Sequence, residues 1–367
     1  MPQVRVGIVG VGNCAAGLIQ AVDLVKSQQV DPKLTHPSIG GYEISDIHFA
    51  SAFDVGTNKV GKPLGRAIYE SPNMVRWKQS VSDCDVQVMA SPVLDGVSDL
   101  VNEKVNPIKN SLPLSKLQDA IINQLEYTQT ELILNYLPVG SQRATEFWAN
   151  VALESGCGMV NCIPVFIASD EAWAKKFAER MLPIIGDDVK GVVGATILHR
   201  TLAQLCKDRG VNVERTYQIN VGGNTDFLNL KESGRLQYKK ISKTEAVQNI
   251  LTEPLPTDQI HVGPSDFIPY LENTKIAFIR VEGSMFPGIP FHMETRLEVD
   301  DKANSAGVVV DAVRYCKVAL DRHIGGSLIE ASAWLMKHPP IPMTDAKAKK
   351  ETDTWLERPP IITISNA

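Results

Sequence analysis

The first half of the chain carries short, continuous apolar runs that alternate with amphipathic stretches. Residues 4–9 form such a run, which is typical of a parallel strand buried on both faces. Similar runs predict further strands at residues 44–53, 86–90, 132–136, 159–162 and 182–185. The stretches between them predict helices at residues 13–26, 115–126, 141–154 and 171–181. This alternation predicts an α/β protein with a doubly wound parallel sheet.

After residue 191 the pattern changes to longer runs in which apolar and polar residues alternate. Runs of this kind at residues 214–221, 275–281 and 290–299 suit a sheet that is covered on one face only. A long helix follows at residues 304–322, and we expect residues 344–367 to form a charged and then proline-rich surface tail. We therefore predict one domain built from both chain ends (residues 1–191 plus 301–367) and an inserted α+β domain (residues 192–300).

The composition is that of a globular protein without a general attraction to polyanions. Of the 367 residues 44% are hydrophobic and 22% charged, and the net charge of -5 gives no reason to expect nucleic-acid or membrane binding. A local basic pocket for an anionic metabolite is compatible with this balance. Six dispersed cysteines without a CxxC pair suggest reduced thiols. With neither a cleavable leader pattern nor a spanning apolar run, we expect a cytoplasmic protein.

A glycine motif directly follows the first predicted strand and opens the first predicted helix. Gly10, Gly12 and Ala15 fit GxGxxA, with Asn13 and Cys14 between them. In this motif the first glycine permits the tight turn, the second lets the backbone approach a pyrophosphate, and the small third residue lets helix and strand pack closely. The motif predicts a Rossmann-type sheet that binds NAD. The alternative is a tight strand–helix turn without a ligand.

The acidic partner of such a motif normally follows the glycines by roughly 20 residues, where it binds the ribose. Asp54 lies much farther away, but residues 28–42 look like a loop insertion, and their removal restores a strand that ends at Asp54. A carboxylate at this position favours NAD over NADP because it would repel a 2′-phosphate. The alternative for Asp54 is the capping of a turn.

A second turn at a predicted strand end is a candidate for lining the nicotinamide. In doubly wound sheets, ligands bind outside the carboxyl ends of the strands. The turn's candidate cofactor-binding residues are Asn135, Tyr136, Leu137, Pro138 and Gly140. A plain strand-to-helix turn is the alternative.

Clusters of lysine, aspartate and asparagine follow other predicted elements. Ser242 and Glu245 fit a capping box, which predicts Lys243 on a first helical turn, where a bound phosphate would offset the unfavourable helix dipole. A solvated basic face is the alternative. The seven histidines show no metal-binding spacing, so a metal site stays unassigned. The polar residues of these clusters include Asp188, Asn224, Asp226, Lys239 and Lys243. Lys275, Asp301 and Lys337 lie outside them, and each taken individually has the pattern of a surface charge.

At these residues the chain resembles the myo-inositol-1-phosphate synthase family in its shorter prokaryotic form. The resemblance covers nearly the whole chain, and its most specific part is the ordered series GDDVK, NTD and KISK. It extends through the motifs VGIVGVGNCA, NYLPVGS, IPVFIASD, GGNTDFLN, GPSD and NSAGVVVDA. The long gap before Asp54 also belongs to this family.

The resemblance implies a redox-neutral isomerisation of D-glucose 6-phosphate to 1L-myo-inositol 1-phosphate. Bound NAD+ would oxidise C5, enolisation and an aldol closure between C6 and C1 would follow, and NADH would reduce C5 again. The inserted domain would then serve catalysis and oligomerisation, in a homotetramer. The resemblance leaves open whether a monovalent or divalent cation assists.

The resemblance also implies roles for the clustered residues. Lys239 and Lys275 would act on the C5 oxygen and in proton transfer, while Lys243 and Lys337 would bind the phosphate and the C1 oxygen. Asp226 and Asp301 would orient these lysines. Asp188 and Asn224 would lie between the nicotinamide and the substrate. Cofactor contacts are further implied for Asp188, Gly191, Asp226 and Lys239.

Two other functions are compatible with the same sequence. An NAD-dependent dehydrogenase of a small phosphorylated sugar would release NADH in each turnover. A non-enzymatic dinucleotide sensor would bind the nucleotide without turnover, but it would have no reason to keep four lysines together with their acids.

Overall fold

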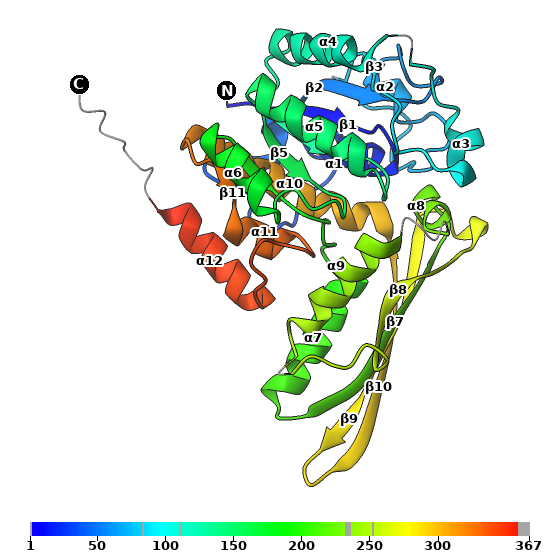
Figure 1. The fold of residues 1–367 in the computed structure, drawn as a ribbon, viewed down its shortest axis with the longest axis vertical. Helices are drawn as coiled ribbons and strands as arrows, with labels where there is room; N and C mark the ends of the chain where they lie inside the picture. Colours follow the sequence, from blue (N-terminus) through cyan, green and yellow to red (C-terminus); the bar gives the residue numbers. More distant parts are fainter. Residues whose placement is uncertain (1, 83, 111, 232–235, 252, 359–367) are drawn as a thin grey trace.

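The fold contains two separate β-sheets that meet at one end of each. The computed structural model of the protein describes residues 2–82, 84–110, 112–231, 236–251 and 253–358, with the backbone alone for residues 236–241, 264 and 265. A seven-stranded sheet lies at the centre of the larger body, and a four-stranded sheet extends away from it (Figure 1). No described helix is long and apolar enough to cross a membrane.

The larger sheet is parallel throughout and has the strand order β11-β6-β5-β4-β1-β2-β3. The chain builds outward from β1 to β3, then returns to the other side of β1 with β4. Ligands of doubly wound sheets bind at such a reversal. The predicted fold class is therefore confirmed. The strands are β1 (Val4–Val9), β2 (Ile47–Asp54), β3 (Val88–Ala90), β4 (Leu132–Asn135), β5 (Gly158–Asn161), β6 (Pro183–Ile185) and β11 (Gly326–Ser327).

Helices cover both faces of this sheet, as its continuously buried strands require. On one face lie α1 (Asn13–Lys26) and α10 (Asp301–Asp321), which pack against each other (Figure 1). Two apolar clusters, one on each face, form the core of this body. The helices of the opposite face are α4 (Leu114–Tyr127), α5 (Gln142–Ser155) and α6 (Glu171–Glu179). Shorter helices are α2 (Leu64–Ala67), α3 (Asp99–Val105) and α11 (Ile329–Leu335).

A long loop separates α1 from the short helix η1 (Ile44–Asp46) that leads into β2, as the predicted insertion requires. A fully buried arginine of α10, Arg314, fastens this loop. Its guanidinium donates to the carbonyl oxygens of His36 (3.0 Å) and Pro37 (2.9 Å). The loop is thus held by a helix from the far end of the chain.

The smaller sheet has the order β10-β9-β7-β8, with antiparallel pairs except for β7 and β8. Its strands are β7 (Asn212–Gly222), β8 (Ile260–Phe267), β9 (Thr274–Met285) and β10 (Ile289–Asp300). The helices of this part are α7 (Ala195–Asp208), α8 (Thr225–Asn229), α9 (Leu236–Gln248) and the single turn η3 (Pro269–Leu271). Helices α7 and α9 run along one face, and the β9–β10 hairpin projects beyond them (Figure 1). The domain boundaries at residues 191 and 301 stay a prediction.

The expected C-terminal surface tail is wrong for residues 345–357, which form helix α12 (Asp345–Glu357). The Asp345 carboxylate accepts from Lys190 Nζ (2.9 Å) and Arg200 Nε (2.7 Å), and both basic side chains are only 3% exposed. At the other end of the helix the buried Trp355 ring lies against Tyr315 of α10. Because these partners are distant in sequence, the charged pattern of the segment did not indicate that it forms a helix packed on the rest of the protein. Residues 359–367 lie outside the described part of the chain.

Candidate active site

One pocket lies where the carboxyl ends of β1 and β4 face the second sheet. The cavity has a volume of about 240 Å³ and opens onto solvent. Predicted residues that line it are Gly12, Asn13, Cys14, Tyr136, Leu137, Pro138, Asp188, Gly191, Asn224, Asp226, Lys243, Lys275, Asp301 and Lys337.

The glycine turn opens α1 toward this pocket. Gly10 has φ +90, and a Cβ there would come within 2.8 Å of the Tyr136 carbonyl oxygen, so only glycine fits. Gly12 is the N-cap without a side-chain cap, and a Cβ on it would meet nothing within 4 Å. The first-turn N–H groups therefore face the pocket, which suits an anionic group. Gly10 and Ala15 lie behind the lining residues.

Asp54 holds the same turn through a hydrogen bond to its backbone. It ends β2, is buried, and is not among the lining residues. Its Oδ2 accepts from Val11 N (2.7 Å) and its Oδ1 from Gly56 N (2.7 Å). These bonds fit the turn-capping alternative. Binding of a ribose by Asp54 stays a prediction.

The turn after β4 presents Tyr136, Leu137 and Pro138 to the pocket. Asn135 is fully buried beneath it: its Nδ2 donates to Asn161 Oδ1 (2.9 Å), and its Oδ1 accepts from Leu137 N (3.2 Å). Gly140 also lies outside the lining. Asn135 therefore holds the turn in place rather than facing the pocket.

Asp188 joins three separate segments of the chain. Its Oδ1 accepts from Lys337 Nζ (2.9 Å), and its Oδ2 accepts from Ser242 Oγ (2.7 Å). Its carbonyl oxygen accepts from Lys337 N (2.7 Å). The segment after β6, helix α9 and the residues after α11 therefore meet at one carboxylate.

The predicted capping box at Ser242 is wrong, because α9 begins at Leu236 and places Ser242 and Lys243 in mid-helix. The Ser242 hydroxyl is used instead by Asp188, and the helix-dipole argument for a phosphate at Lys243 falls with the cap. Lys243 is nevertheless buried and lines the pocket. Lys239 lies one turn earlier on α9, and its side chain is outside the described part of the structure.

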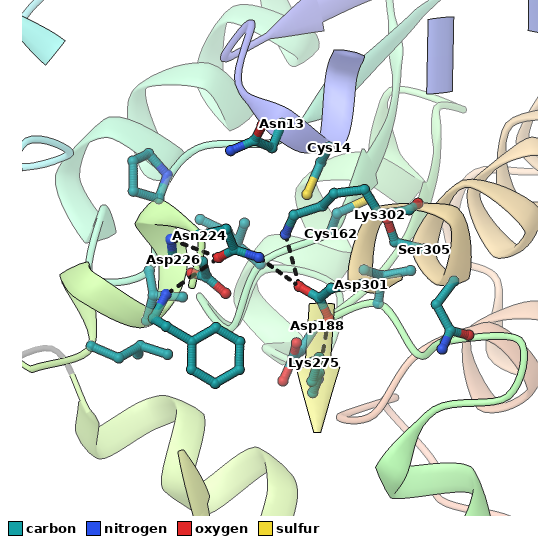
Figure 2. A pocket seen from close by; sticks show the side chains of 18 of the residues that line it. Asn13, Cys14, Cys162, Asp188, Asn224, Asp226, Lys275, Asp301, Lys302 and Ser305 are labelled. Atoms are coloured by element: carbon teal, nitrogen blue, oxygen red, sulfur yellow. Dashed lines mark hydrogen bonds and ion pairs between the residues drawn. The ribbon is translucent and has the colours of Figure 1, made fainter. Parts of the chain in front are cut away.

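A second carboxylate, Asp301, collects side chains from the other sheet. Its Oδ1 accepts from Lys275 Nζ of β9 (3.2 Å), and its Oδ2 accepts from Asn224 Nδ2 (3.3 Å) (Figure 2). Asp301 is the first residue of α10, which starts earlier than the predicted residue 304. Asn224 in turn caps α8 by accepting from Asp226 N (3.0 Å), so Asp226 is fixed on its first turn. Four of the predicted residues, Asn224, Asp226, Lys275 and Asp301, thus lie together.

Gly191 lies where the chain leaves the larger body and passes α10. Asn304 of α10 binds this segment twice, as an acceptor for Val193 N (2.8 Å) and as a donor to Val193 O (2.9 Å). A Cβ on Gly191 would come within 2.7 Å of Asn304 Oδ1. The glycine therefore permits a close approach at the rim of the pocket.

Lys302 also lines the pocket, although the sequence did not indicate it as a site residue. Its Nζ donates to Asp301 Oδ2 (2.9 Å) and lies beside Cys14 (Figure 2). Burial lowers the pKa of Lys302, but the Asp301 and Asp226 carboxylates more than offset it, so the pKa is raised and the ammonium stays charged. Burial raises the pKa of the Cys14 and Cys162 thiols, which keeps them neutral. In sequence, Lys302 looks like a surface charge beside an aspartate.

Lysine ammonium groups and carboxylates supply most of the charge in the site. Within the part of the chain that the structure describes, no group of three or more histidine, cysteine, aspartate or glutamate side chains is placed to hold a metal ion. The fold and the pocket together define a Rossmann-type α/β protein. At its sheet reversal, an open helix N-terminus faces paired lysines and acids.

Comparison with known proteins identifies the family. A model of myo-inositol-1-phosphate synthase matches residues 194–302. Inositol-3-phosphate synthase of Mycolicibacterium smegmatis is 44% identical over 97% of this chain and 98% of its own length. The protein of that name from Corynebacterium glutamicum is 43% identical over 96% and 98%, respectively. The chain belongs to the myo-inositol-1-phosphate synthase family.

Solved structures support the same fold. A myo-inositol-1-phosphate synthase-related protein from Thermotoga maritima superposes with a TM-score of 0.84 at 24% identity, covering 98% of this chain and 99% of that one. Inositol-3-phosphate synthase from Caenorhabditis elegans gives a TM-score of 0.77 at 13% identity, over 97% and 86% of the two chains. These structures support the fold, and the family resemblance inferred from the sequence is confirmed by the relatives that are 43–44% identical.

Proposed function

We propose that this protein catalyses the NAD-dependent, redox-neutral isomerisation of D-glucose 6-phosphate to 1L-myo-inositol 1-phosphate. The observation that carries the proposal is the convergence of Lys275, Lys302 and Asn224 on Asp301, in one pocket with the glycine turn. Similarity to proteins named inositol-3-phosphate synthase supports the substrate and product.

The residues present fit a dinucleotide. The uncapped N-terminus of α1 at Gly12 offers its N–H groups to a pyrophosphate, and Asn13 and Cys14 lie beside it. The turn at Tyr136 to Pro138, together with Gly191, would border the nicotinamide half, and we retain Asp54 as the residue for the ribose. When bound, NAD would supply the redox chemistry at C5 in both directions.

The Asp301 group would act on the C5 oxygen. Lys275 is held 3.2 Å from Asp301 and is therefore pre-oriented as a cation for charge that develops on this oxygen. Lys239 would assist in proton transfer from α9. Asp226 and Asp301 would orient the lysines, and Asn224 would lie between nicotinamide and substrate.

The Asp188 group would act at the other end of the substrate. Lys337, paired with Asp188 at 2.9 Å, and Lys243 on α9 would bind the phosphate and the C1 oxygen. Two fixed cation groups would bring C6 and C1 of one bound molecule together, which favours the intramolecular aldol closure over release of an open intermediate.

A product assay tests the proposal directly. Purified protein is incubated with glucose 6-phosphate and NAD+, phosphorylated products are followed by phosphorus NMR, and NADH by absorbance. We expect inositol phosphate without accumulated NADH. Stoichiometric NADH with an oxidised sugar phosphate would instead identify a dehydrogenase, and nucleotide binding with no turnover on any phosphorylated sugar, with or without added cations, would identify a sensor.

We also propose a homotetramer in a reducing, cytoplasmic setting. The β9–β10 side of the smaller sheet leaves large apolar side chains in solvent, Phe286 being 95% exposed and Met285 and Ile289 exposed beside it. A second copy covering this strip would bury them. The structure forms no disulfide among the six cysteines. Light scattering after size exclusion tests the assembly, and a monomer at micromolar concentration would contradict it.

A further inference from the structure

The Lys302 ammonium lies inside the pocket, at the border between the glycine turn and the Asp301 group. It extends from α10 between Cys14 on one side and Asp301 on the other (Figure 2). Its side chain is only 5% exposed, and it donates to Asp301 Oδ2 and hydrogen-bonds the Cys14 thiol. An ammonium with these two partners retains one further N–H group for a ligand.

Packing fixes where this ammonium lies. Lys302 is the second residue of α10, and its N–H and that of Ala303 donate to the N-cap Asp300 (2.9 Å each). A Cβ built on Gly17 of α1 would come within 3.2 Å of Lys302 Cβ, so the two helices touch at the base of this side chain. The ammonium is therefore rigidly placed relative to the first turn of α1.

We propose that Lys302 is a dinucleotide-binding residue whose ammonium neutralises the pyrophosphate on the α1 N-terminus and links it to Asp301. The inference rests on the proposed use of NAD. The α1 N-terminus supplies N–H donors and a partial positive charge, but no charged side chain of its own. Lys302 adds the full charge at this point. Through Asp301 the bound pyrophosphate is coupled to Lys275, so the cofactor pre-orients the lysine that acts on the substrate.

The test measures ligand binding by titration calorimetry with the full-length protein. K302M should raise the Kd of NAD+ and of ADP-ribose by about 10-fold or more, since a charged hydrogen bond is lost, and leave the Kd of adenosine unchanged. The matched control is K317M, which removes a buried, carboxylate-paired lysine of the same helix outside the pocket. It should leave all three Kd values within about twofold.

Two matched substitutions separate charge from packing. K302A leaves a cavity beside Asp301 that ammonium ions can enter, whereas K302M fills it. Ammonium chloride at tens of millimolar should therefore restore NAD+ affinity to K302A but not to K302M, and choline chloride should restore neither. Thermal unfolding of each variant shows that the fold is kept.

The outcomes are distinct. Wild-type Kd for NAD+ in folded K302M, or equal losses for adenosine and NAD+, would overturn the role of Lys302. Binding of NAD+ by the wild type without any turnover of glucose 6-phosphate would contradict the proposed function and leave Lys302 as a nucleotide-binding residue. No binding of NAD+ by the wild type would overturn both.

Discussion

The two sheets of this protein differ in how deeply they are buried and in what they bring to the pocket. The seven-stranded parallel sheet has helices on both faces and a continuous apolar interior. The four-stranded sheet has helices α7 and α9 on one face, only small apolar clusters, and a projecting hairpin. The first provides the glycine turn, Asp188 and Lys302, and the second provides Asn224, Asp226, Lys243 and Lys275.

The junction between the two bodies separates the proposed tasks only in part: the larger body supplies the glycine turn, but also Asp188 and Lys337, which we propose act on the substrate. A rigid, doubly covered sheet suits the binding of a cofactor that stays in place through the whole cycle. The thinner sheet carries groups that need only be aligned when the substrate is bound. Asp301 lies between the two bodies. It is the first residue of α10, and its N–H donates to the carbonyl oxygen of Asn273, directly before β9 (3.0 Å). The following predictions test this division.

The largest expected effect is on turnover. Lys275→Met should lower kcat about 10²- to 10³-fold, because a pre-oriented cation at the reacting oxygen is lost. The Kd of NAD+ should change by no more than about threefold, since Lys275 belongs to the four-stranded sheet and is coupled to the cofactor only through Asp301. The control Lys231→Met removes an exposed lysine of the same region that pairs with Asp266. Product formation and NAD+ titration check both, and a parallel loss of NAD+ affinity would break the division of tasks.

The next effect concerns the joint between the two bodies. Asp345→Asn leaves the buried Lys190 and Arg200 without their shared carboxylate, and should cost about 3–5 kcal/mol in the free energy of unfolding. The matched variant on the same helix is Glu357→Gln, whose side chain is exposed; it should cost less than about 1 kcal/mol. Urea unfolding measures both, and similar costs would show that α12 does not anchor the joint.

A pair of identical core substitutions compares the two sheets directly. Ile8→Ala in β1 should cost about 4–5 kcal/mol, because the site is enclosed on both faces and cannot collapse. Ile279→Ala in β9 should cost about 2–3 kcal/mol, because its partly exposed neighbours Phe291 and Met293 can shift into the space. Denaturant titration measures both; equal costs would mean that the smaller sheet is packed as rigidly as the larger one.

The smallest effect is a pH dependence of opposite sign in the two bodies. The Asp311 and Asp353 carboxylates raise the pKa of His36, so its contribution to stability is present below about pH 6.5 and is lost as the pH rises through the raised pKa. Burial lowers the pKa of His199, on α7, to about 4. Its contribution is present above about pH 6.5 and is lost as the pH falls toward 4.

Two single variants separate these signs. Relative to the wild type, His36→Gln should lose stability at pH 5.5 more than at pH 8. His199→Gln should show a flatter fall of the unfolding free energy between pH 6.5 and 4.5. Denaturant titrations across this range measure both, and the same sign for both histidines would contradict the assigned environments.

The sequence predicted well the features that depend on local pattern. Strand β1 and helix α1 have the predicted limits. The continuous apolar run defines the strand, and the glycine turn marks where the strand ends and the helix begins. The alternating runs predicted three of the four strands of the smaller sheet, β7, β9 and β10, since side chains of a one-sided sheet must alternate, but they did not predict β8. The GxGxxA motif and the turn after β4 lie at the sheet reversal, as the strand order requires.

The features that the sequence missed depend on distant partners. Helix α12 has few apolar residues, and its docking rests on Lys190 and Arg200. Ser242 satisfied a local capping rule, yet its hydroxyl binds Asp188 from another segment. Lys302 becomes distinctive only because α1 packs over it. In each case the contact of a charged or polar residue is made with a neighbour from a distant part of the chain, which the local sequence pattern cannot reveal.

The bond between Arg314 and His36 spans 278 positions of the chain, and this has a consequence for synthesis on the ribosome. At about 5–20 residues per second, α10 emerges roughly 15–55 s after the loop that it fastens. During that interval the sheet face that α10 later covers and the edge strand β6, which later pairs with β11, stay exposed. Such delayed closure raises the contact order and slows folding. The newborn chain therefore exposes these apolar surfaces for longer than a Rossmann unit completed by its first half would.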